Sequence, residues 1–195
     1  MTDTTYRPEQ LTLRIKHQQF IEALRAHGVP EAQLPVTAPM CGELLISYAF
    51  DLPDHFVMAT PPLLAAAGIE PDTRKALAVA NFKGRFSAQL VKTGIHEGLI
   101  AVRTGQDMEA VLLVFDGFWQ GHVRPEIAGD LIVCVPHRDV LLIADTAVPG
   151  ALQALRAESA RAFHAVADNH ALSLQQMQWT ADGWALFNDT VEGAK

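Results

Sequence analysis

The sequence predicts an α+β fold, in which a mainly antiparallel sheet built from hairpins carries helices packed on it. Three observations lead to this prediction. Segment 129–145 holds two runs rich in Val, Ile and Leu, joined by a compact polar turn at 136–139. A second pair of apolar runs occupies 43–60, and a third pair flanks the Asp-Gly turn signal at 182–183. Helix-like spacing of apolar residues separates these hairpins, so helices should cover the sheet.

The N-terminal part predicts one helix followed by a connector. Pro8 suits the first turn of a helix, and Gly28 with Pro30 ends the pattern about five turns later. On its apolar face, His17 should be a buried imidazole. Residues 29–42 contain three prolines and show no periodicity. The apolar positions of this predicted helix are Leu13, His17, Phe20, Ile21 and Leu24.

The first hairpin should span residues 43–60. Residues 43–51 are predicted to form a strand, 52–55 a turn and 56–60 the return strand. Thr60 can then cap a short helix that begins at Pro61 and stops at Gly68.

A second helix is predicted over 71–81, followed by two short strands at 86–92 and 99–104. Segment 107–119 is ambiguous, because Val111-Leu112-Leu113-Val114-Phe115 could be a buried strand. We favour a helix capped by Asp107, since its apolar residues follow helical spacing: Met108, Val111, Leu112, Phe115 and Trp119.

After the central hairpin, Pro149 should open a further amphipathic helix, and the last hairpin should pair 177–180 with 184–187. Both halves of the chain therefore have the order hairpin, helix, hairpin, which suggests a duplicated ββαββ unit with repeats 43–104 and 130–188. We expect an N-terminal helix and connector over 1–42, a single α+β domain over 43–188 and a polar tail over 189–195. The inner face of the helix holds Leu152, Leu155, Ser159, Ala162, Phe163 and Val166.

Composition excludes several classes of function. The 195 residues hold 15 basic and 22 acidic side chains, so the net charge is 15 − 22 = −7, which disfavours nucleic acid as a partner. The longest uncharged apolar stretch, 56–69, is too short to span a membrane. The start of the chain does not resemble a signal peptide. Cys41 and Cys134 should be reduced thiols, and we expect a cytoplasmic protein.

Segment 129–141 carries the most distinctive motif, an apolar strand that ends in Val-Pro-x-Arg-Asp and leads into a second apolar strand. It resembles the best-marked block of the YtpQ-like proteins, a bacterial family of unknown function. The resemblance is clearest over about residues 70–145. It implies neither catalytic residues nor a substrate.

The candidate binding residues lie at the two hairpin turns. Arg138 and Asp139 could present a guanidinium and a carboxylate to a ligand, with His137 beside them and His55 in the first hairpin. The simpler interpretation is structural. In that case Arg138 pairs with a nearby carboxylate, Asp130 or Asp145, and Asp139 bonds backbone amides to close its turn.

No catalytic or metal-binding motif is present. Cys134, His137 and Asp139 could suggest thiol catalysis, but Cys134 is surrounded by Ile, Val and Pro and lacks an activating cation. The eight histidines do not show metal-ligand spacing, so we predict neither a metal nor a cofactor.

These observations favour a non-catalytic binding or protein-interaction module. One form of it is an acidic partner that neutralises a basic protein, as an inhibitor or immunity protein does. The alternative is a hydrolase or transferase whose carboxylate and histidine set is assembled by the fold at the hairpin turns. The residues first considered for that site are Arg138, Asp139, Glu43, Asp51 and His55.

Overall fold

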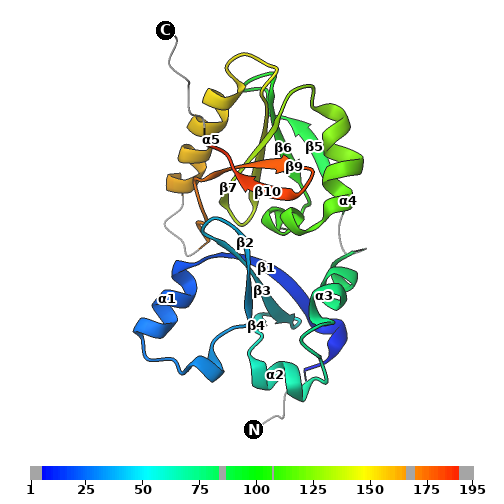
Figure 1. Ribbon diagram of the computed structural model, residues 1–195, viewed down its shortest axis with the longest axis vertical. Coiled ribbons are helices and arrows are strands. Elements are labelled where there is room, and N and C mark those ends of the chain that lie inside the picture. Colours follow the sequence, from blue (N-terminus) through cyan, green and yellow to red (C-terminus); the bar gives the residue numbers. More distant parts are fainter. Residues whose placement is uncertain (1–5, 84–86, 107, 166–169, 189–195) are drawn as a thin grey trace.

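The chain folds as α+β, with helices packed on two antiparallel sheets of four and six strands, which confirms the predicted fold class. The computed structural model describes residues 6–83, 87–106, 108–165 and 170–188. Figure 1 shows the four-stranded sheet in the lower half of the molecule and the six-stranded sheet in the upper half.

The four-stranded sheet is built around β3 (Leu44–Asp51), which confirms the strand predicted over 43–51. β1 (Leu11–His17) pairs with one edge of β3 along its whole length. β2 (Thr37–Cys41) and β4 (Phe56–Met58) pair with successive parts of β3 as well. The predicted first hairpin is therefore the β3–β4 pair.

The helix predicted from Pro8 onwards is wrong over its first half. Leu11, Leu13 and Ile15 are buried in the core, and this alternation with polar residues is the period of a strand, which is realised as β1. Pairing with β3 selects the strand over the helix, because it provides hydrogen-bond partners for the backbone groups of β1. Only α1 (Gln19–Ala26) keeps the helical half of the prediction.

The predicted connector 29–42 also contains a strand, β2, at the edge of the sheet. Pro39 is exposed there, as expected of a proline that cannot donate to a ladder. Two helices follow β4. They are α2 (Pro61–Ala66) and α3 (Arg74–Phe82), close to the predicted ranges, although Thr60 makes no side-chain cap.

The six-stranded sheet has the order β10-β9-β7-β8-β6-β5. Its centre is the predicted hairpin, with β7 at Leu131–His137 and β8 at Val140–Asp145, both almost entirely buried. β7 runs further than predicted, so the turn is two residues long. The flanking strands are β5 (Gln89–Lys92), β6 (Leu99–Arg103), β9 (Gln176–Thr180) and β10 (Gly183–Leu186). Phe86, predicted as the start of β5's strand, lies outside the described residues.

Helix α5 (Ala151–Ala165) covers one face of this sheet. Alternation places Cys134 on that face and Val133 and Val135 on the other, as predicted. On the inner face of α5, Leu155 and Ser159 are buried and Val166 lies outside the described residues.

The opposite face is covered by segment 108–126, which is helical but not the single α-helix that the spacing predicts. It consists of a 3₁₀ helix (Glu109–Val114), the short α4 (Asp116–Phe118), a π-helical turn (Trp119–Val123) and a 3₁₀ turn (Arg124–Glu126). Asp107, the predicted cap, lies outside the described residues. The 3₁₀ helix is almost entirely buried, so packing on several sides, rather than one amphipathic face, decides its shape.

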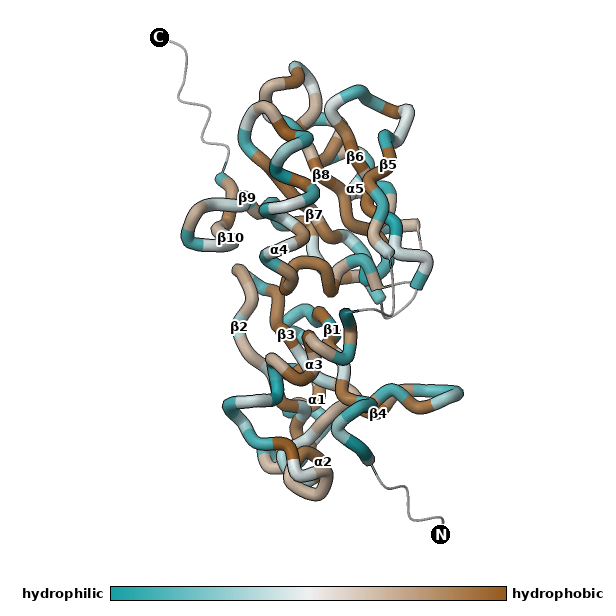
Figure 2. The backbone as a smooth tube through the Cα atoms, turned by 90° about the vertical axis from the view of Figure 1, so that its right-hand side faces the viewer, coloured by the Kyte–Doolittle hydropathy of each residue, from teal (hydrophilic) through white to brown (hydrophobic). Residues whose placement is uncertain are grey.

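One hydrophobic core is shared by the two sheets. Leu13 and Phe50 of the first sheet belong to the same buried cluster as Val133 and Ile143 of the second, with Trp119 between them. Figure 2 shows apolar residues along β3, through the waist of the molecule and into β7.

A polar strap, residues 173–175, also ties the two sheets together. Gln175 Nε2 donates to the carbonyl of Cys41 at 2.8 Å, and Gln175 Oε1 accepts from the backbone N–H of Glu43 at 3.0 Å. Ser173 Oγ donates to the Glu43 carboxylate. The β2–β3 turn is therefore fastened to the segment before β9.

Both halves of the chain show the order hairpin, helix, hairpin, but β3 and β4 lie in a different sheet from β5 and β6. The duplication, the domain limits and the tail over 189–195 stay predictions. Among the helices of the described ranges, none has the length and apolar character that crossing a membrane requires.

Candidate functional site

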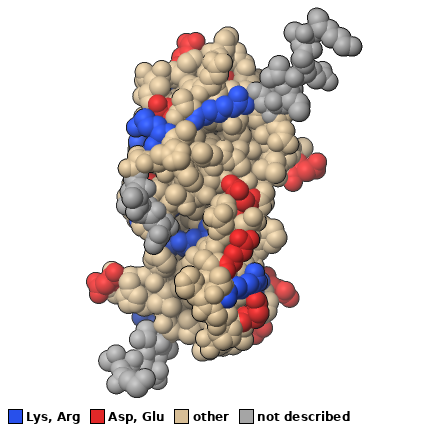
Figure 3. Space-filling model, turned by 90° about the vertical axis from the view of Figure 1, so that its left-hand side faces the viewer, with Lys and Arg blue, Asp and Glu red and all other residues tan. Residues whose placement is uncertain are grey.

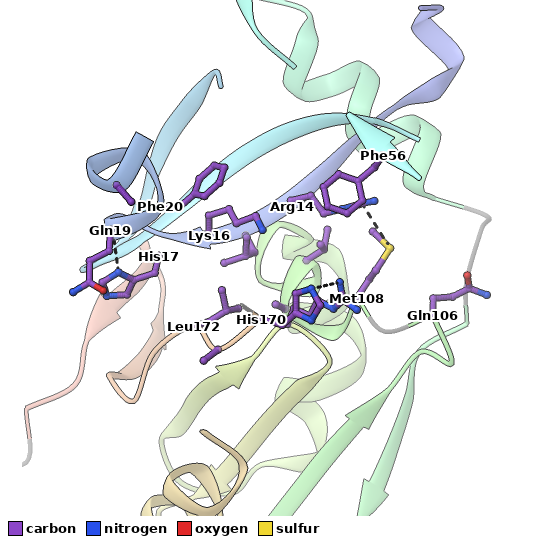
Figure 4. A pocket seen from close by; sticks show the side chains of 16 residues that line it. Arg14, Lys16, His17, Gln19, Phe20, Phe56, Gln106, Met108, His170 and Leu172 are labelled. Atoms are coloured by element: carbon purple, nitrogen blue, oxygen red, sulfur yellow. Dashed lines mark hydrogen bonds between the residues drawn. The ribbon is translucent and has the colours of Figure 1, made fainter. Parts of the chain in front are cut away.

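A cavity of about 640 Å³ lies at the waist, between the two sheets. The first sheet contributes β1, α1 and the start of β4, and the second contributes the β7–β8 turn and the segment before β9. Figure 4 shows β1 above the cavity, with Arg14 and Lys16 pointing down toward His170 and Met108. Residues two apart on a strand share a face, which explains why Arg14 and Lys16 both reach the same space.

Arg14 is the most firmly held of the basic residues. Its Nη2 lies 2.5 Å from Asp51 Oδ1 at the end of β3, so the Asp51 carboxylate offsets its charge. Its Nη1 donates to Thr12 Oγ1 at 2.7 Å and to the carbonyl of Leu13 at 2.9 Å, and contacts Met108 Sδ at 3.8 Å. These contacts orient the guanidinium at one end of the cavity.

Arg138 enters from the opposite side, at the turn between β7 and β8. Backbone bonds fix its position, because its N–H donates to the carbonyl of His170 at 3.1 Å and its carbonyl accepts from Ala110 at 3.0 Å. Its Nη1 donates to His170 Nε2 at 3.0 Å. Its Nε is buried and has no hydrogen-bond partner among the described residues. Arg138 therefore retains an unused donor beside the cavity.

Lys16 lines the same cavity and lies two residues from Arg14 along β1. Its Nζ sits 5.1 Å from the centre of the Phe20 ring, a cation–π contact. Burial, and then the charges of Arg14 and Arg138, lower the pKa of Lys16 below its ordinary value. No acidic side chain offsets this charge, since Lys16 has no carboxylate partner in the parts of the chain that the structure describes.

The remaining walls are mostly apolar. Phe20 from α1 and Phe56 from β4 provide aromatic surface, and the Arg14 guanidinium lies 4.9 Å from the centre of the Phe56 ring. Among the described lining residues there is neither Asp nor Glu. The cavity therefore combines clustered positive charge with apolar surface. Further apolar side chains come from Ala23, Met108, Val111 and Leu172.

The chain matches no protein-family model, no curated protein and no solved structure. The resemblance of segment 129–141 to the YtpQ-like family stays a prediction. Interpretation of the site rests on its own geometry.

Of the predicted binding residues, Arg138 lines the cavity. Its predicted pairing with Asp130 or Asp145 is wrong, since its side chain turns toward His170. The Asp145 carboxylate instead accepts backbone N–H groups at the far end of the hairpin. The physical reason is distance along the strands: Arg138 and Asp145 lie at opposite ends of β8.

His137 and Asp139 lie beside the cavity rather than in its lining. His137 is buried, and its Nδ1 donates to the Asp139 carboxylate. The prediction that Asp139 bonds backbone amides is therefore replaced by this side-chain pair. His55 is exposed in the β3–β4 turn and does not line the cavity, although its neighbour Phe56 does.

The carboxylates considered for an enzyme site serve as partners of basic groups. Asp51 pairs with Arg14, and Glu43 Oε2 lies 3.2 Å from His17 Nε2. His17 Nδ1 accepts from the backbone N–H of Gln19 at 3.1 Å, which leaves its Nε2 as the donor to Glu43. His17 is thus the last residue of β1, half-buried and paired, rather than an imidazole on a helix face.

The thiols lie outside the cavity lining. Burial raises the pKa of Cys134 to about 11 and also raises the pKa of Cys41. Both are free cysteines. Within the described ranges, no cluster of three metal-ligating side chains was found.

Sequence reasoning missed Arg14, Lys16 and His170. The predicted helix concealed the first two, whereas a strand reading would have placed them on one polar face beside Thr12. His170 carried no local signal, because only the pairing of 170–173 with β7 brings it to Arg138.

Proposed function

We propose that this protein is a non-catalytic binding protein whose cavity takes a small organic anion with an apolar part. One observation carries the proposal: Arg14, Lys16 and Arg138 converge on a cavity whose described lining residues include no acid. The rest of the chain is acidic, with a net charge of −7. Figure 3 shows basic atoms in the waist of one face, with separate acidic patches beside and below them and further basic atoms in the upper and lower halves.

Electrostatics supports a carboxylate or phosphate as the recognised group. Bringing cations together in a partly buried space is unfavourable, and a bound anion relieves that repulsion. A guanidinium offers paired donors that match a carboxylate or phosphate. The Arg138 guanidinium lines the cavity, and its Nε is a buried donor without a partner among the described residues. The apolar walls at Phe20 and Phe56 would hold the uncharged part of the ligand.

The hydrolase or transferase alternative is favoured by one observation, that the cavity reaches both hairpin ends through Phe56 and Arg138. Asp51 and Glu43 would then have to act while held by Arg14 and His17. The inhibitor or immunity form of the binding hypothesis draws its support from the net negative charge, which suits a basic protein partner. A cytoplasmic location agrees with the two free cysteines.

The proposal can be tested by measuring the thermal unfolding temperature in the presence of benzoate, with benzamide as an uncharged control of similar shape. A ligand that binds the folded state raises the unfolding temperature with concentration. Benzoate should do so, and benzamide should not. Arg138→Gln should weaken benzoate binding about tenfold or more, because it removes charge-assisted donors.

Arg161→Gln is the matched control, since Arg161 is exposed on α5 and pairs with Glu158. It should bind benzoate like the unchanged protein. Equal affinity of Arg138→Gln and Arg161→Gln for benzoate would contradict the assignment of the cavity. So would equal stabilisation by benzoate and benzamide.

A further inference from the structure

We propose that Lys16 forms a Schiff base with a small anionic aldehyde or 2-oxo acid held in the cavity. This inference rests on the proposed function, because the arginines must first hold the anionic group. It goes further by naming a reacting atom, Lys16 Nζ, and a class of ligand in which a carbonyl adjoins a carboxylate.

Lys16 is placed where its amine can meet a ligand in the cavity. Its side chain projects from β1 into the cavity, and Figure 4 shows its nitrogen between Phe20 and Arg14. The residue is half-buried, so its amine lies at the cavity wall and is shielded from bulk water on one side. Among the described residues, Lys16 makes no ion pair that would hold it protonated.

The cations near Lys16 favour the unprotonated form of its amine, which is the form that reacts. A lysine amine becomes nucleophilic at neutral pH when it is desolvated or lies beside other cations. Burial and the charges of Arg14 and Arg138 lower the pKa of Lys16 below its ordinary value, which increases the fraction of its amine that is unprotonated. The groups facing it are Arg14 and His17 on β1, Arg138 on the β7–β8 turn, and His170 before β9.

The same arginines supply orientation. Arg14 on β1 and Arg138 on the β7–β8 turn line the cavity from different sheets, and both lie close enough to Lys16 to lower its pKa. A carboxylate held by either guanidinium would place an adjoining carbonyl carbon near the amine, which raises the effective concentration of the reacting groups. The thiols Cys41 and Cys134 do not compete, since both are buried outside the cavity lining and their pKa values are raised.

The reaction balances without an outside oxidant or reductant. The neutral amine of Lys16 attacks the carbonyl carbon and forms a C–N bond, and its proton passes to the carbonyl oxygen. Loss of water from this carbinolamine then gives the imine. Hydrolysis reverses both steps, so the adduct is reversible.

Reductive trapping tests the proposal. The full chain is incubated with glyoxylate and sodium cyanoborohydride, which reduces the imine to a stable secondary amine, and peptide mass spectrometry follows each lysine over time. Lys16 should be modified faster than exposed Lys75, because its lowered pKa leaves a larger fraction of its amine unprotonated and the cavity holds the glyoxylate carboxylate beside it. Glycolaldehyde, a neutral aldehyde of similar size, should show no such preference.

Two variants separate this inference from the proposed function. Lys16→Arg keeps the positive charge but has no primary amine, so it should lose trapping at position 16. Arg138→Gln should lose the glyoxylate preference of Lys16, whereas Arg161→Gln should keep it. Circular dichroism of each variant confirms folding.

The outcomes are distinct. Benzoate binding with no faster trapping at Lys16 than at Lys75 would overturn the Schiff base and leave the binding function standing. If Lys16 were trapped faster than Lys75 to the same degree with glyoxylate and with glycolaldehyde, the amine would react without recognising the anion. That result would also overturn the Schiff-base proposal. Failure of both benzoate binding and trapping would remove the two proposals together.

Discussion

At the scale of single residues, the chemistry of the cavity depends on how unequally its three cations are compensated. Arg14 has Asp51 at 2.5 Å, whereas Arg138 has His170 Nε2 as its side-chain acceptor and keeps a buried, unsatisfied Nε. Lys16 lies close enough to both arginines to feel their charge, and it has no carboxylate partner among the described residues. Such an arrangement costs stability, and this cost is one reason why we propose the cavity as a binding site.

Affinity for a non-carbonyl anion should therefore depend on pH through Lys16. The folded-state pKa of Lys16 lies below 10.5, so its ammonium is lost as pH rises through that lowered value. Benzoate binding should weaken over the same interval, since the anion needs the charged form. Calorimetric titration at rising pH measures this dependence.

Lys16→Arg provides the comparison, because a guanidinium stays charged throughout the interval. Its benzoate affinity should remain flat where that of the unchanged protein declines. Parallel pH profiles for the two proteins would show that Lys16 does not contribute to anion binding.

At the scale of elements, the β7–β8 hairpin is closed at its far end by one carboxylate. Asp145 accepts the N–H groups of Ala128 at 2.9 Å, Gly129 at 2.8 Å and Ala147 at 2.9 Å. Burial of Asp145 acts to raise its pKa, but these bonds outweigh it and hold the pKa below the usual value. The approach is close, since a Cβ on Gly129 would lie 2.5 Å from Ala147 N.

Asp145→Ala should lower the free energy of unfolding by about 2–3 kcal/mol, because it removes the acceptor of three amides. The pH dependence has a definite sign. Since the folded-state pKa is depressed, the contribution is present above the unfolded value of 3.8 and lost as pH falls through the folded value. Urea unfolding across acidic pH measures both effects.

Asp182→Ala is the matched control, because Asp182 is exposed in the β9–β10 turn. We expect a change within about 0.5 kcal/mol for this surface position. If Asp145→Ala were equally mild, closure of the central hairpin by Asp145 would be refuted.

At the scale of the whole molecule, the two sheets are held together by a shared core and by the polar strap 173–175. Within the second sheet's own half, Trp184 ties β10 to the 3₁₀ helix at Glu109–Val114, since its Nε1 donates to the carbonyl of Leu113 at 2.9 Å. The cavity lies between the sheets, so its dimensions depend on these ties.

Gln175→Ala should lower the free energy of unfolding by about 1–2 kcal/mol, since it removes two bonds across the sheets. The backbone N–H of Glu43 loses its acceptor and should exchange with solvent faster in hydrogen-exchange measurements. Gln153→Ala on the exposed face of α5 serves as the control. Unchanged protection of Glu43 would show that the strap does not couple the sheets.

The sequence by itself determined the elements whose signals are local. The central hairpin, the Asp-Gly hairpin β9–β10, and helix α5 follow from runs of apolar residues and turn residues that lie within a few positions of one another. Arg138 was recognisable for the same reason, as a charged residue in a distinctive turn.

Only the tertiary structure decided the rest. Residues 11–17 satisfy both a helical and a strand period, and pairing with β3 selects the strand. The residues that line the cavity with Arg138 include 14–16 and 170–172, which meet it only through long-range packing. A cavity between two sheets cannot be recognised from the spacing of residues in the sequence. Its walls are brought together by contacts between residues that lie far apart in the chain.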